Sequence, residues 1–130
     1  MRLVLGIVLA AAVTLSCDDT ASLQDSSGIQ GRVTQSPVCP VETDPPVPGC
    51  EPVALAAPLE VRDSSGSSVA RVSSDTNGRY EVALAPGRYF LHPLPLSPTA
   101  HLPAPPPPVE VNVPERVWIH IDLDYDTGIR

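Results

Sequence analysis

From Gly28 onward, apolar and polar residues alternate along most of the chain. Ile29, Gly31 and Val33 fall on one face of the first run, and polar side chains fall on the other. A period of two is typical of half-buried β-strands, and no helical period longer than a turn is present. The same alternation predicts strands within residues 59–62, 69–73, 80–84, 89–91, 109–113 and 117–125.

Short turn signals separate these runs. Asp-Ser-Ser-Gly-Ser-Ser follows Arg62, Asn77-Gly78 favours the positive φ of a tight turn, and Pro86-Gly87 marks the next reversal. About seven short strands with turns between them are typical of one small all-β domain. We therefore expect an antiparallel, seven-stranded Greek-key β-sandwich over residues 28–130.

Residues 93–108 interrupt the alternation with a proline-rich segment. Proline lacks the amide hydrogen that a central strand needs, so we expect a polyproline II connection here. A connection of this length inside a compact domain calls for a reason. We expect the segment to lie across the outer face of a sheet and to cover Trp118, together with Phe90. If it projected into solvent instead, Trp118 would be bare and would lead the candidates for a binding site.

The N-terminus has the pattern of an export signal. Arg2 precedes an uncharged run over residues 3–16, which is shorter than the roughly 20 residues needed to span a bilayer. The run ends in Thr-Leu-Ser-Cys, which resembles the lipobox of bacterial lipoproteins, although Thr14 stands where that family usually has leucine. The resemblance implies a signal peptide over residues 1–16, removed on export, and a diacylglyceryl group on Cys17. The alternative is an ordinary signal peptide with Cys17 as a spare thiol.

Residues 17–27 are polar and predict a flexible, lipidated tether. The membrane is then a partner through the N-terminal lipid. We expect the protein in a bacterial cell envelope, on the inner or outer membrane, facing the periplasm or the cell surface.

The chain has three cysteines, and an odd number in an exported protein leaves one over. If Cys17 carries lipid, Cys39 and Cys50 remain as a pair in a compartment where disulfides persist. The alternative is two free thiols. Zinc is not expected, because no histidines lie at finger-like spacing from these cysteines.

Charge and motifs argue against several classes of function. Eight basic residues, all arginine, are outnumbered by 15 acidic ones, and the net charge of −7 with no basic run in the sequence argues against binding to nucleic acid. Asp122, Asp124 and Asp126 are similar to the start of an EF-hand loop, but Gly128 comes one residue late and the final glutamate is missing. No Gly-x-Ser-x-Gly elbow is present. We expect no metal, no cofactor and no enzymatic activity.

The outward positions of the predicted strands hold Phe90, Trp118 and His120. Exposed aromatic side chains of this kind mark contacts with sugars or with partner proteins. These three residues are therefore the candidate binding surface for a carbohydrate or an envelope protein.

Residues 75–91 follow the pattern Asp-x-x-Gly-x-Tyr-x-Val-x-Leu-x-Pro-Gly-x-Tyr, made by Asp75, Gly78, Tyr80, Val82, Leu84, Pro86, Gly87 and Tyr89. This pattern resembles the carboxypeptidase regulatory-like domain, a transthyretin-like sandwich. The resemblance implies a non-catalytic binding or structural module. The alternative is a small hydrolase, because hydroxyisourate hydrolase shares that fold; its Tyr-Arg-Gly-Ser tail is replaced here by Tyr-Asp-Thr-Gly-Ile-Arg.

Overall fold

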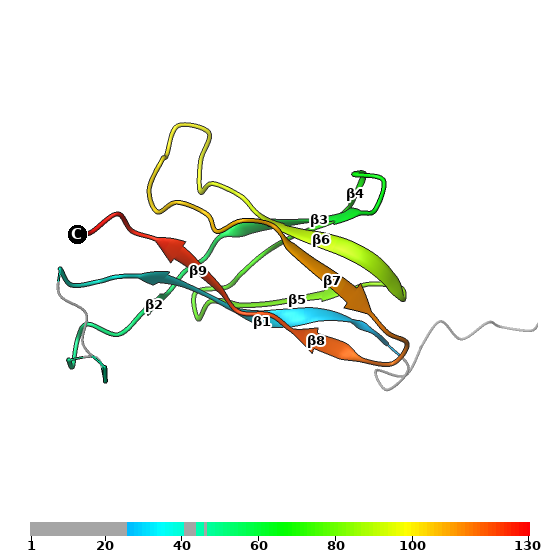
Figure 1. Ribbon diagram of the computed structural model, residues 1–130, viewed down its shortest axis with the longest axis horizontal. Coiled ribbons are helices and arrows are strands. Elements are labelled where there is room, and N and C mark those ends of the chain that lie inside the picture. The colour runs from blue at the N-terminus through cyan, green and yellow to red at the C-terminus, as the bar shows by residue number, and fades with distance from the viewer. Residues whose placement is uncertain (1–25, 41–43, 46) are drawn as a thin grey trace, which may run out of the picture.

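A computed structural model describes residues 26–40, 44–45 and 47–130 (Figure 1). Nine strands make up two packed sheets, and the described residues contain no helix, hence none that could cross a membrane. The strands are β1 (Gly28–Ser36), β2 (Val53–Ala54), β3 (Pro58–Asp63), β4 (Ser68–Ser73), β5 (Arg79–Ala83), β6 (Gly87–Pro93), β7 (Val109–Val113), β8 (Trp118–His120) and β9 (Leu123–Asp126). The predicted all-β sandwich is confirmed.

The first sheet is organised around β1. This strand pairs antiparallel with β5 over its first half and with β2 near its end. It also pairs in parallel with β8 and then with β9. Both edges of β1 are therefore occupied, and each pairing within the first sheet includes β1. The second sheet is antiparallel in the order β4-β3-β6-β7.

The hydrophobic core lies between the inner faces of the two sheets. The apolar members of the alternating runs supply it, because successive side chains of a strand point to opposite faces. Its largest fully buried side chains are Tyr125, Ile29, Leu59, Leu91, Val33 and Val61. The expected inward faces of β1, β3 and β6 are confirmed.

The last predicted strand, over residues 117–125, is interrupted at Ile121 and Asp122, where β8 ends and β9 begins. Gly31 lies opposite this break, and a Cβ at Gly31 would come within 1.8 Å of the Ile121 carbonyl oxygen. The Tyr80 hydroxyl donates a hydrogen bond to the same oxygen. Asp122 Oδ1 accepts the Arg32 N–H at 2.9 Å, so a side chain replaces a backbone acceptor here.

Two other features of the first sheet differ from the expected antiparallel sandwich of seven strands. The chain reaches β8 from β7, across the sandwich, so β8 runs parallel to β1. Turn signals in a sequence indicate hairpins between neighbouring strands, but they give no information about such crossovers. The two-residue β2 is too short to show any alternation.

The two ends of the sandwich are named here by β1. The near end is where β1 begins at Gly28, and the far end is where β1 finishes at Ser36. The structure adds Ser26 and Ser27 to the folded part at the near end. Ser27 is buried, and its hydroxyl donates to the Leu84 carbonyl at 2.7 Å.

The proline-rich segment begins later than expected, because Pro93 still belongs to β6 and pairs with Leu59. The segment then runs along the far end, where Ala104 and Asp126 exchange backbone hydrogen bonds of 2.7 and 2.9 Å. Trp118 pairs with Gly28 at the near end, whereas Asp126 pairs with Ser36. Eight strand residues separate these positions, or about 26 Å. The expected cover over Trp118 is therefore wrong.

We predict that Gly31→Ala destabilises the fold by about 3 kcal/mol, because the added methyl group has no space beneath the Ile121 carbonyl. Urea denaturation measures the loss. Gly66→Ala is the matched control, since Gly66 has φ of +89° but nothing within 4 Å of an added Cβ; it should lose about 1 kcal/mol for backbone strain alone. Equal losses in the two variants would contradict the close contact at Gly31.

Candidate functional site

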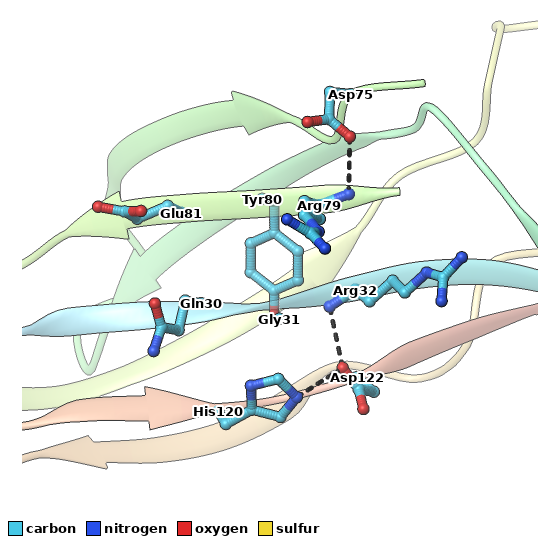
Figure 2. A pocket seen from close by; sticks show the side chains of 9 residues that line it. All are labelled: Gln30, Gly31, Arg32, Asp75, Arg79, Tyr80, Glu81, His120 and Asp122. Carbon is cyan, nitrogen blue, oxygen red and sulfur yellow. Dashed lines mark hydrogen bonds and ion pairs between the residues drawn. The ribbon is translucent and has the colours of Figure 1, made fainter. Parts of the chain in front are cut away.

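An open groove of about 690 Å³ lies on the outer face of the first sheet (Figure 2). It runs across β5, β1 and the break between β8 and β9. The residues that line it are polar with few exceptions: Gln30, Gly31, Arg32, Asp75, Arg79, Tyr80, Glu81, His120 and Asp122.

The turn before β5 forms one wall of the groove. The Asp75 carboxylate accepts the N–H groups of Asn77 and Arg79, each at 2.9 Å. Gly78 has φ of +77°, and a Cβ there would lie 2.3 Å from the Val33 carbonyl oxygen. This turn chemistry was visible in the sequence, and it fixes where Arg79 starts β5.

His120 and Asp122 form the opposite wall. Their Nε2 and Oδ1 atoms are 2.9 Å apart, and the two side chains are 64% and 65% exposed. A side-chain contact this exposed contributes less than about 1 kcal/mol. The same Asp122 oxygen accepts the Arg32 N–H, so Asp122 is held by the backbone while His120 is held by Asp122 alone.

The remaining groove side chains present unused hydrogen-bonding groups. Among the described residues, the side chains of Gln30, Arg79 and Glu81 have no hydrogen-bond or ion-pair partner. The Arg32 Nε donates to the Asn77 carbonyl at 3.2 Å. The groove thus offers donors and acceptors of both charge signs, which suits a polar ligand.

Within the described part of the chain, no serine, threonine or cysteine lines the groove with His120. Tyr80 reaches its floor, but burial raises the pKa of this hydroxyl, which stays neutral and donates to the Ile121 carbonyl. Burial also raises the pKa of Tyr125 to about 12, and its hydroxyl donates to the Leu94 carbonyl at 2.6 Å.

The three aspartates near the C-terminus serve separate contacts. Asp124 accepts the hydroxyls of Thr34 and Ser36, the first at 2.9 Å. Asp126 pairs with Arg130 at 3.2 Å, and this guanidinium lowers the pKa of the Asp126 carboxyl. The described residues hold no group of three or more side chains arranged to bind a metal ion.

The expected aromatic surface is divided between the two sheets. Trp118 and His120 share the outer face of β8, where the indole N–H donates to the Ser26 hydroxyl at 3.2 Å. The indole lies against Gly28, where a Cβ would be 2.6 Å from its Cζ3. Phe90 is on the second sheet, and Arg88 lies 5.5 Å above its ring. The structure therefore brings Trp118 and His120 together and keeps Phe90 apart.

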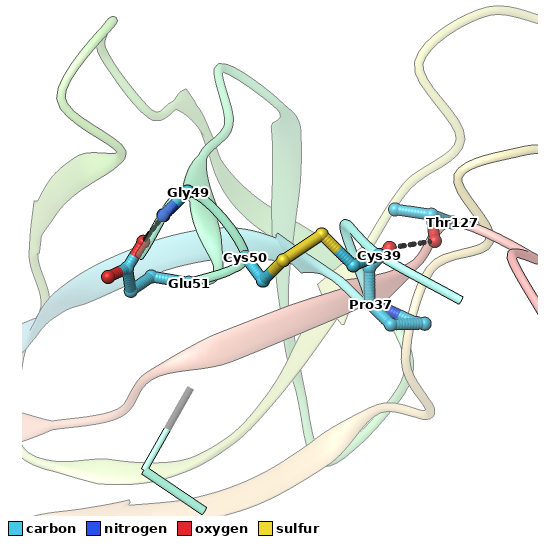
Figure 3. Close-up of a disulfide and its surroundings, with 6 residues drawn as sticks. All are labelled: Pro37, Cys39, Gly49, Cys50, Glu51 and Thr127. Carbon is cyan, nitrogen blue, oxygen red and sulfur yellow. Dashed lines mark hydrogen bonds between the residues drawn. A yellow bond between two sulfur atoms is a disulfide. The ribbon is translucent and has the colours of Figure 1, made fainter. Parts of the chain in front are cut away.

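Cys39 and Cys50 form a disulfide, as the sequence predicts, with their Cα atoms 5.4 Å apart (Figure 3). It closes the loop between β1 and β2 at the far end. The Cys50 N–H donates to the Val47 carbonyl at 2.9 Å, and Thr127 Oγ1 donates to the Pro37 carbonyl at 2.5 Å. Cys17 lies outside the described residues.

One buried charge was not singled out from the sequence. Glu60 is only 4% exposed, although it lies on the outer face of the second sheet. Its carboxylate is paired with Arg62 and, at 2.7 Å, with Arg71, and these guanidinium groups lower its pKa. The sequence showed Glu60 and Arg62 on one strand face. The pairing register that brings Arg71 opposite Glu60 was needed to find the network.

Neither a known protein family nor a curated protein matches the sequence. Solved structures are similar in fold. The minor pilin of the Gram-positive pathogen Streptococcus agalactiae matches 80% of this chain at 11% identity with a TM-score of 0.56. The TIE protein of Bacillus anthracis matches 77% at 13% identity with a TM-score of 0.50. This chain spans 45% of the pilin chain and 17% of the TIE chain, and the likeness shows the fold alone.

We predict that Cys39→Ser lowers the free energy of unfolding by about 2–4 kcal/mol, because the crosslink restricts the unfolded chain. Chemical denaturation of oxidised wild type and variant measures the change. Wild type treated with a reductant is the control and should fall to the stability of the variant. A variant as stable as oxidised wild type would contradict a stabilising role for the disulfide.

Proposed function

We propose that the protein is a lipid-anchored, non-catalytic binding or structural module of the bacterial cell envelope. The observation that carries this proposal is the groove on the first sheet. It combines unused hydrogen-bonding side chains with a histidine–aspartate pair that has no nucleophile beside it. Such a surface is suited to holding a polar partner, not to transforming it.

We also infer that the chain belongs with the carboxypeptidase regulatory-like domains. The motif at residues 75–91 supports this, since each described role within it is structural. Asp75 and Gly78 shape the turn, and Tyr80 and Val82 are buried in the core. The Tyr89 hydroxyl closes the turn before β6 by donating to the Ala85 carbonyl at 2.6 Å. A domain of this kind is typically a supporting appendage.

The similarity in fold to a minor pilin supports a role at the cell surface, because a pilin is a surface protein. A sandwich that two bacterial proteins of such different length share is a reusable module. From this comparison we take only a surface or structural role at the envelope.

A small hydrolase is the second candidate, and the His120–Asp122 pair is the observation in its favour. We predict that His120→Ala changes the free energy of unfolding by less than about 1 kcal/mol, because the side-chain contact with Asp122 is exposed. A screen with ester, amide and cyclic imide substrates measures activity of wild type and variant. Turnover by wild type that His120→Ala abolishes would overturn the non-catalytic assignment.

The anchor is the most direct part of the proposal to test. We predict that Cys17 in wild-type protein from bacterial membranes carries a diacylglyceryl group, because the residues before it resemble a lipobox. The two acyl chains would hold the protein firmly at the membrane, whereas a single chain gives only marginal binding. Mass spectrometry of the mature N-terminal peptide measures the lipid. In Cys17→Ala the lipid mass should be absent and the protein should leave the membrane fraction.

Cys50→Ser is the matched control for this experiment, because it removes a different cysteine and should keep the lipid. A soluble wild type without lipid on its N-terminal peptide would contradict the anchor.

A further inference from the structure

Exposed apolar side chains are concentrated at the far end of the sandwich. Seven large hydrophobic side chains are exposed in the described part of the chain, and five of them lie at this end. These five are Val47, Val53, Leu96, Leu102 and Ile129, with Leu102 reaching 57% exposure. We call them the far-end surface. A gathering of this kind marks an interaction site more often than scattered apolar residues do.

Three segments distant in sequence build this surface, and contacts join them. The C-terminal segment lies between the disulfide loop and the proline-rich segment. Thr127 bonds to the backbone of Ser36 and Pro37 on one side. On the other side, Ala104 pairs with Asp126, and Leu102 lies so close to Gly128 that a Cβ there would be 2.8 Å from it.

The described parts of the segments that carry the far-end surface are restrained by proline rings and by contacts with the rest of the chain. Most of the chain's 17 prolines fall within residues 37–53 and 94–108. The disulfide closes the first segment, and the Tyr125 hydroxyl fixes the start of the second at Leu94. Segments ordered before binding lose little conformational freedom when a partner docks, which favours affinity. Exposed apolar groups on such segments are suited to recognition.

Charge at this end indicates the chemistry of the partner. Among the described residues, the same segments contain the carboxylates of Asp44, Glu51, Asp124 and Asp126. Their one guanidinium, that of Arg130, is already paired with Asp126. A partner with an apolar patch and a rim of lysine or arginine side chains would complement both features.

The position of the proposed tether bears on which occupant reaches the far-end surface. Cys17 precedes Ser26 by nine residues, which reach about 30 Å at most. The chain joins the sandwich at the near end, so the far end is the part of the sandwich most distant from the attachment point of the proposed tether.

We propose that the far-end surface docks a protein of the envelope through an apolar patch with a basic rim. The orientation, though not the surface itself, rests on the proposed lipid anchor. The contact combines the exposed apolar side chains, of which Leu102 is the most exposed, with the carboxylates of the same segments. It is separate from the groove on the first sheet, which lies on a side of the sandwich and is polar.

Site-specific photocrosslinking in cells that make the full, lipidated chain tests the proposal. The probe p-benzoylphenylalanine replaces Leu102 or Val47 at the far end. Val69 and Val117, exposed at 46% and 41% elsewhere on the surface, are the matched control positions. Both far-end probes should yield one protein adduct of the same mass, and neither control position should.

The chemistry of the contact is checked with variants. In the chain that carries the probe at Val47, Leu102→Asp should lower the adduct yield about tenfold, whereas Val69→Asp should leave it unchanged. Circular dichroism confirms that both variants fold, and Leu102→Met should retain the adduct. High salt before irradiation should also reduce the yield, because it screens the charged rim.

Other outcomes would overturn the proposal. These are an adduct of twice the chain's own mass, a lipid adduct, equal adducts at the control positions, adduct peptides without basic side chains, or no adduct at all. Lipid analysis of Cys17 on the same samples separates this result from the anchor. A lipidated chain without a far-end adduct refutes the docking surface alone, and an unlipidated chain with one refutes the anchor alone.

Discussion

The structure depends on β1, because every pairing in the first sheet runs through it. Ile29 and Val33 anchor this strand in the core with no exposed surface. Between them, Gly31 allows the chain to cross at Ile121, where β8 gives way to β9. The strand thereby ties residues near the start of the domain to those near its end. Burial of its apolar face and the close contact at Gly31 fix which side chains reach the groove.

Local patterns were sufficient to predict the sandwich, its core positions and its principal turns, whereas the Cys39–Cys50 disulfide was predicted from the number of cysteines and the proposed lipidation of Cys17. Alternation reports burial because a strand with one buried face repeats every two residues. Features that depend on pairing between distant segments could not be predicted in this way. The parallel β1–β8 pairing, the Asp122 contact to the Arg32 amide and the Glu60 network all require a register that no local signal encodes.

The proline-rich segment shows the same limit. Its composition correctly predicted that it is not a strand, but the side chains it packs against are set by the ends of β6 and β7. These place it beside β9 at the far end and leave Trp118 at the near end, bonded to Ser26. The candidate binding residues are consequently divided among two outer faces and one end of the sandwich. The molecule then has a direction: the described chain enters the sandwich at one end, and the exposed apolar side chains are concentrated at the other.

This direction is the central claim, and energy transfer from Trp118 tests it most directly because the chain has one tryptophan. Lipidated protein is reconstituted into vesicles that contain a dansyl-labelled phospholipid, and the excited indole transfers energy to dansyl groups only at short range. The account predicts strong transfer from the tethered protein and none from a Cys17→Ala chain mixed with the same vesicles. Tethered protein without transfer would contradict it, because the near end would then face away from the membrane.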